Sequence, residues 1–175
     1  SQDAGVEILG EVRRLQAPPL DSLNVLARHY SEQLATLAAV LNKDSDNMYA
    51  EYFLKMVASE VTGVPGTTKA GVDTLKGLLQ SWDLDASQYR IADGSGVSSY
   101  TLISPESMVT LLRNMYDDVT VRHEFISSLP IAGVDGTLSS RMKSGAAHRV
   151  VRAKTGTISA VSTLGGYTTT RDGET

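Results

Sequence analysis

Two triplets in this 175-residue chain carry the residue types of an acyl-transfer site. Ser45-Asp46-Asn47 offers a hydroxyl that can pass a proton between a lysine and a leaving amine, and an amide that can hydrogen-bond a substrate carbonyl. Lys154-Thr155-Gly156 offers a positive charge and a hydroxyl for a substrate carboxylate, and a glycine against which a substrate backbone can lie. The triplets predict a cleft with catalytic Ser45, Asn47 and Lys154 and with substrate-binding Thr155, Gly156 and Thr157.

Each triplet alone can also be explained without an active site. Ser45-Asp46-Asn47 is equally typical of a helix cap, and Lys154-Thr155-Gly156 occurs by chance in some chains of this length. The active-site interpretation is favoured because both triplets are present. The first is expected between two helices and the second on a strand, and both are rigid places from which to present side chains.

Apolar residues at i, i+3, i+4 and i+7 predict the helices that position the first triplet. One helix, over 34–41 with Ser31 as its N-cap, precedes the triplet, and another follows it. The second helix is expected to bury one stripe, made of Tyr49, Tyr52, Phe53, Met56 and Val57. The other helices are predicted over 72–79, over 105–115 with Ser104 as N-cap, and over 121–126.

Strands are predicted at both ends of the chain. Residues 150–158 and 161–170 are expected to form two adjacent strands, and 6–14 and 23–30 two short ones. The order of strands, helices and strands predicts an α+β fold in which a helical cluster packs on an antiparallel sheet. Asp172-Gly173 predicts a hairpin turn that lacks its second strand, so the fold is expected to be incomplete in this chain.

A glycine-containing loop is predicted at Asp93-Gly94-Ser95-Gly96, with φ > 0 at its glycines. Asp93 and Ser95 are expected to shape the cleft, although a capping aspartate in a two-glycine turn explains them equally well.

The nucleophile that acyl transfer requires is not evident in the chain. Ser140-Arg141-Met142-Lys143 matches a Ser-x-x-Lys pattern, but it lies in a Gly/Ser-rich segment and not at the start of a buried helix. We therefore expect the attacking serine to lie outside these residues.

The composition is that of an ordinary globular protein, with 41% hydrophobic and 21% charged residues. A formal net charge of −4, with scattered Lys and Arg, argues against nucleic acid as a partner. The absence of cysteine excludes disulfides and a thiol nucleophile. The three histidines are isolated and lack metal-ligand spacing, so neither a metal nor a cofactor is expected.

Longer blocks around the triplets carry a family resemblance. They are residues 45–51, 64–67, 92–98, 129–138 and 153–157. On these blocks the chain, from about Val6 to its C-terminus, resembles the low-molecular-mass class C penicillin-binding proteins, the D-alanyl-D-alanine carboxypeptidase/endopeptidase family.

The resemblance implies a β-lactamase/transpeptidase-like fold and a serine acyl-enzyme that acts on peptidoglycan stem peptides and is acylated by β-lactams. The backbone N–H of Thr157 would then be one oxyanion donor. An exported protein, periplasmic or otherwise extracytoplasmic, is also implied.

The resemblance also implies a domain organisation. Residues 1–30 would return from inserted domains, and residues 31–175 would be the C-terminal portion of the transpeptidase-like domain. The nucleophile would lie well before Ser1, in an N-terminal part of the same protein or in a separate chain.

Two other functions remain open at this point. One is a non-catalytic peptidoglycan-binding module that lacks the nucleophile, and the other is a β-lactamase-like hydrolase. A labelled penicillin separates the three, because a carboxypeptidase keeps the label, a lactamase turns it over and a binding module does not react.

Overall fold

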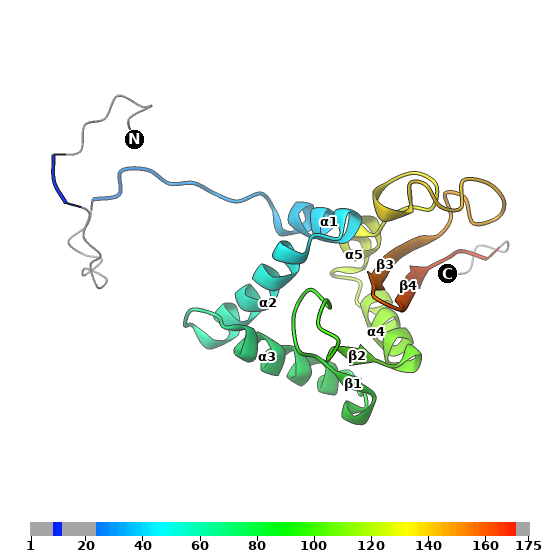
Figure 1. Cartoon of the computed structure of the whole chain (residues 1–175), viewed down its shortest axis with the longest axis horizontal. Coiled ribbons are helices and arrows are strands. Elements are labelled where there is room, and N and C mark those ends of the chain that lie inside the picture. The colour runs from blue at the N-terminus through cyan, green and yellow to red at the C-terminus, as the bar shows by residue number, and fades with distance from the viewer. Residues whose placement is uncertain (1–8, 12–23, 171–175) are drawn as a thin grey trace. The chain divides into compact units, whose positions relative to one another are not determined.

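A computed structural model describes residues 9–11 and 24–170 of the chain, which divides into two units, residues 1–31 and 32–175 (Figure 1). In the first unit, the described residues form neither helix nor strand. The strand predicted over 23–30 is therefore wrong for residues 24–30, because a strand requires a paired backbone and no described strand pairs with them. Most of the strand predicted over 6–14 lies outside the described residues.

The second unit begins with three helices: α1 (Leu34–Asp44), α2 (Asn47–Thr62) and α3 (Thr68–Ser81). The prediction of helices on both sides of the first triplet is confirmed. Ser31 is not the N-cap of α1, because the helix starts later and Gln33 occupies that position without a side-chain hydrogen bond.

The face that α2 buries differs from the predicted one. Leu54 and Ala58 are buried, and α3 packs against α2 (Figure 1). The predicted stripe is largely open, with Tyr52, Met56 and Val57 exposed. Helix α3 approaches closely because Gly71 has no side chain, and a Cβ there would clash with Leu54 O. Apolar periodicity alone cannot say which face of α2 its partner helix covers.

Helices α4 (Pro105–Asp117) and α5 (Arg122–Ser128) follow, and both were predicted. Ser104 caps α4 as expected, since its hydroxyl accepts a hydrogen bond from the Ser107 N–H at 3.0 Å. Helix α5 packs against both α1 and α4. The end of α1, which leads into the Ser-Asp-Asn triplet, is thereby fixed against the rest of the unit.

Two antiparallel hairpins complete the architecture. The larger one pairs β3 (Arg152–Ile158) with β4 (Val161–Tyr167), and its register sets Lys154 opposite Gly165. The smaller one, β1 (Tyr89–Arg90) with β2 (Leu102–Ile103), was not predicted because two-residue strands have no readable alternation. The fold is α+β, with helices beside small antiparallel sheets, as expected.

Two groups of buried side chains hold the unit together. Leu79, Leu84 and Tyr89 form one, with the partly buried Trp82 against it. The others lie in segments that backbone hydrogen bonds join near the start of β3: Leu129, Ala132, Leu138 and Ala153. Ala153 precedes Lys154 directly, so the strand that carries the second triplet is anchored at its base.

None of the helices in the described part of the chain is long and apolar enough to cross a membrane. The hairpin turn predicted at Asp172-Gly173 lies outside the described residues.

Candidate active site

The Ser-Asp-Asn triplet forms the corner between α1 and α2. Ser45 ends α1 in the left-handed conformation, with φ 57° and ψ 47°, and its N–H donates to Leu41 O. Asp46 is the N-cap of α2, because its carboxylate accepts from the Tyr49 N–H at 2.9 Å. Asn47 is the first residue of α2. The helix-cap and active-site interpretations of the triplet are thus compatible. Asp46 caps α2, and the side chains of Ser45 and Asn47 remain available to contact a ligand.

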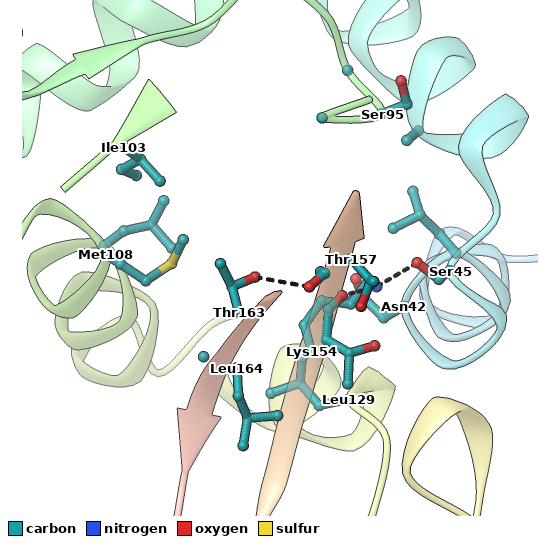
Figure 2. Close-up of a pocket in the computed structure, with 18 of the residues that line it drawn as sticks. Asn42, Ser45, Ser95, Ile103, Met108, Leu129, Lys154, Thr157, Thr163 and Leu164 are labelled. Atoms are coloured by element: carbon teal, nitrogen blue, oxygen red, sulfur yellow. Dashed lines mark hydrogen bonds between the residues drawn. The ribbon is translucent and has the colours of Figure 1, made fainter. Parts of the chain in front are cut away.

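Lys154 meets this corner from the opposite strand. Its Nζ donates to Ser45 Oγ at 2.6 Å and to Thr155 O at 2.7 Å (Figure 2). The lysine is half-buried, and burial lowers the pKa of its ammonium below the ordinary value of 10.5. The two triplets, far apart in sequence, therefore share one hydrogen bond.

A cleft of about 830 Å³ opens at this contact. Every residue predicted to be catalytic or substrate-binding lines it: Ser45, Asn47, Lys154, Thr155, Gly156 and Thr157. Ser95 also lines the cleft, whereas Asp93 and Ser140 do not. Figure 2 shows Met108 and Ile103 facing Ser45 and Lys154 across the opening.

One edge of β3 faces the cleft without a partner strand. At the start of β3 this edge is paired: the Ala153 N–H donates to Pro130 O, and Arg152 forms an isolated antiparallel β-bridge with Ile131. Because N–H groups alternate along a strand, those of Thr155 and Thr157 point to the same edge as that of Ala153. No described segment pairs with the edge beyond Ala153. An extended peptide in the cleft can therefore find backbone donors there.

The loop after β1 is held by two carboxylates. Asp93 accepts from Ser98 N at 2.7 Å and from Thr101 Oγ1 at 2.6 Å, and also from Ser95 Oγ and Gly96 N. Burial acts to raise the pKa of Asp93, but these hydrogen bonds outweigh it and lower the pKa. Asp93 thus shapes the loop from within, and Ser95 is the member of the pair that reaches the cleft.

The second carboxylate, Glu51, was missed by sequence reasoning. Its Oε1 accepts from both Gly94 N and Ser95 N at 3.0 Å, which fixes the loop to α2 one turn after Asn47. Of the two glycines in this loop, Gly96 has the predicted positive φ and Gly94 does not. A Cβ at Gly94 would lie 2.6 Å from Ala50 O, so glycine is needed there for close approach to α2.

An ion pair at the end of α1, two residues before Ser45, was also missed. Lys43 Nζ lies 2.6 Å from Asp135 Oδ2 and donates to Leu129 O at 3.2 Å. The only available signal was the proximity of Lys43 to Ser45 in the sequence. Within the described ranges, no three His, Asp or Glu side chains gather in a way that could hold a metal ion.

Relatives of known function match nearly the whole chain. D-alanyl-D-alanine carboxypeptidase of Actinomadura sp. (strain R39) is 36% identical, with 97% of this chain and 32% of the relative covered. D-alanyl-D-alanine carboxypeptidase DacB of Haemophilus influenzae is 34% identical, with 97% and 35% covered. The chain thus spans about a third of the length of these relatives.

A solved structure agrees with this similarity. Penicillin binding protein 4 (dacB) from H. influenzae, in complex with a β-lactam, superposes with a TM-score of 0.87 at 32% identity. The superposition covers 99% of this chain and 40% of that one. The profile of the D-Ala-D-Ala carboxypeptidase 3 (S13) family matches residues 2–175. With two triplets joined at one cleft and relatives matched over nearly its whole length, this chain belongs to the D-Ala-D-Ala carboxypeptidase 3 (S13) family.

Proposed function

We propose that this chain supplies one half of the active site of a serine-type D-Ala-D-Ala carboxypeptidase/endopeptidase that works through an acyl-enzyme. The observation that carries the proposal is the 2.6 Å hydrogen bond from Lys154 Nζ to Ser45 Oγ at the cleft. A hydroxyl in contact with a half-buried lysine can pass a proton during acyl transfer. Names of the relatives support the substrate class, D-alanyl-D-alanine peptides.

Each residue at the cleft then has a role. Ser45 passes a proton to the leaving amine, and the Asn47 amide hydrogen-bonds a carbonyl of the stem peptide. Lys154 provides the positive charge that attracts the terminal D-alanine carboxylate, which the hydroxyls of Thr155 and Thr157 bind. Gly156 leaves room for the peptide backbone beside β3, and the Thr157 N–H on the open edge donates to the oxyanion.

The attacking serine is proposed to come from outside these residues, in another part of the full polypeptide or in a partner chain. Ser140 is exposed, lies in a turn and does not line the cleft, which argues against it. The cleft has many apolar lining residues, Met108, Leu112 and Leu164 among them, and Met108 faces Ser45 across the opening (Figure 2). An apolar lining of this kind suits a packed helix bearing Ser-x-x-Lys better than it suits bulk water.

Peptidoglycan and β-lactams are the proposed ligands, and an exported protein is the proposed setting. The solved relative was captured with a β-lactam, and penicillin-binding proteins take their name from such reactions. A β-lactam resembles the acyl-D-alanine bond and presents a carboxylate, so the same lysine and threonine side chains would bind it.

A fluorescent penicillin tests the proposal on the full polypeptide that contains this chain. We expect a stable covalent label that maps outside the 175 residues, together with release of D-alanine from a D-Ala-D-Ala peptide. Lys154→Met should abolish both, whereas Lys76→Met, on the outer helix α3, should abolish neither.

Other outcomes of the same experiment contradict the proposal. Rapid turnover of the penicillin identifies a β-lactamase-like hydrolase. No label on the full polypeptide identifies a non-catalytic peptidoglycan-binding module. A label on Ser140 would refute the external nucleophile.

A further inference from the structure

Thr137 contacts the substrate-binding threonine from behind the cleft. Its Oγ1 lies 2.8 Å from Oγ1 of Thr155, eighteen positions further along the chain. Thr155 lines the cleft, whereas Thr137 does not. Any influence of Thr137 on a ligand must therefore pass through the Thr155 hydroxyl.

The turn that carries Thr137 is held from three sides. Asp135 is fixed by Lys43 and by the Ile131 N–H, which donates to its Oδ1 at 2.8 Å. Gly136 has φ +53°, and a Cβ there would lie 2.6 Å from Lys43 O. Leu138 is fully buried. The position of the Thr137 hydroxyl is consequently set by the fold and not by the ligand.

Which of the two hydroxyls donates the hydrogen bond between them bears on carboxylate binding. The 2.8 Å contact joins two hydroxyls, and each carries one proton that it can donate to the other. A carboxylate only accepts hydrogen bonds, and Thr155 can donate to one only if Thr137 becomes the donor within the pair. Thr137 can be that donor, because its hydroxyl has no other hydrogen-bond partner within the part of the chain that the structure describes.

We propose that Thr137 is a positioning residue that donates to Thr155 when a free C-terminal carboxylate enters the cleft, and that it thereby sets the preference for substrates with that terminus. The pair then forms a relay in which Thr137 donates to Thr155 and Thr155 donates to the carboxylate. This inference rests on the proposed function, in which Thr155 binds the D-alanine carboxylate.

The test compares two peptides that differ only at the C-terminus, one ending in D-Ala-D-Ala with a free carboxylate and one with a C-terminal amide. In the full polypeptide, Thr137→Val should lower kcat/KM for the free carboxylate about tenfold, mainly through KM, because a hydrogen bond to a charged group is weakened. The amide should lose much less, so the ratio of the two kcat/KM values falls. Thr137→Ser keeps the hydroxyl and should restore the ratio.

Two controls separate positioning from damage to the fold. Thr110→Val makes the same change on α4, where the hydroxyl donates to Glu106 O away from the cleft, and it should leave the ratio as it is. In a Thr155→Val background, the further change Thr137→Val should have no effect on the ratio, because the residue through which it acts is gone.

Three results would overturn the inference and leave the proposed function standing. An equal loss on both peptides would mean that Thr137 only supports the fold, and an unchanged ratio would mean that Thr155 needs no partner. A persistent effect of Thr137→Val in the Thr155→Val background would remove the relay. If the unmodified protein instead cleaves both peptides equally well, the carboxylate-binding role in the proposed function fails, and the inference fails with it.

Discussion

Lys43 and Asp135 join the end of α1, which leads to Ser45, to the turn that supports Thr155. Lys43 lies two residues before Ser45, and Asp135 lies two residues before Thr137, which contacts Thr155. Their side chains are 2.6 Å apart and only partly exposed, 24% for Lys43 and 35% for Asp135. Movement of this pair would displace both triplets, so the pair links stability to the geometry of the site.

Acid should weaken the fold through Asp135. Burial acts to raise the pKa of this carboxyl, but the hydrogen bonds from Lys43 and the Ile131 N–H outweigh it and hold the pKa below the ordinary 3.8. Because the folded-state pKa is depressed, the stabilisation is present above pH 3.8 and is lost as the pH falls through the folded-state pKa.

The full polypeptide with Asp135→Asn should therefore lose about 1 kcal/mol of unfolding free energy at pH 7, a modest value because water screens the pair. Its deficit relative to the unmodified protein should shrink in acid. Urea unfolding across pH measures this, with exposed Asp73→Asn, which also breaks an ion pair, as the control. A deficit that grows in acid would contradict the assignment.

Ser45 should show opposite effects on stability and on activity. Its φ of 57° is unfavourable for any residue with a Cβ and costs about 1 kcal/mol. Ser45→Gly relieves that cost while Ser45→Ala does not, and both remove the hydroxyl. We expect both variants to lose D-Ala-D-Ala hydrolysis by roughly 10² to 10⁴-fold, and Ser45→Gly to unfold at higher denaturant than Ser45→Ala. Full activity in either variant would remove Ser45 from the proton pathway.

The local elements of this site could be predicted from sequence, whereas its supporting contacts could not. The helical spacing on both sides of Ser45 and the strand pattern over 150–158 are local, and they placed one triplet between two helices and the other on a strand. The contacts of Glu51 with Gly94 and of Lys43 with Asp135 span 43 and 92 positions, and no local pattern records them. The strand predicted over 23–30 was wrong for 24–30 for a related reason, since strand formation depends on a pairing partner and not on the segment alone.

Lys154 should set the alkaline limit of peptide cleavage. Burial lowers its pKa, so the ammonium that attracts the carboxylate is lost as the pH rises through a value below 10.5. In the full polypeptide, kcat/KM for a free-carboxylate peptide should fall in that range. Lys154→Arg, which keeps its charge at all accessible pH values, should be slower but should lack the alkaline decline. An unchanged decline in the arginine variant would assign it to another group.

Glu51 should control how well the loop of Ser95 is positioned. Glu51→Ala leaves the Gly94 and Ser95 N–H groups without their acceptor, and we expect a loss of about 1 kcal/mol of unfolding free energy with a raised KM. Glu51→Gln keeps an acceptor oxygen at the same distance along the side chain, so its unfolding free energy and its KM should both stay close to those of the unmodified protein. If Glu51→Gln is as impaired as Glu51→Ala, the negative charge matters and not the hydrogen bonds to the loop.

Gly94 gives an independent test of the same contact between the loop and α2. In Gly94→Ala the new methyl would lie 2.6 Å from Ala50 O, a backbone atom inside a helix that cannot yield, so the loop must move away from Asn47. We expect lower stability and a KM for the D-Ala-D-Ala peptide raised at least as much as in Glu51→Ala. Gly77→Ala, in the interior of α3 with nothing within 4 Å of the new methyl, should instead stabilise by up to about 1 kcal/mol. The control adds the same methyl group but should raise the stability, so it separates the clash at Gly94 from the general effect of a Gly→Ala change. An unchanged KM in Gly94→Ala would mean that the position of the loop does not govern substrate binding.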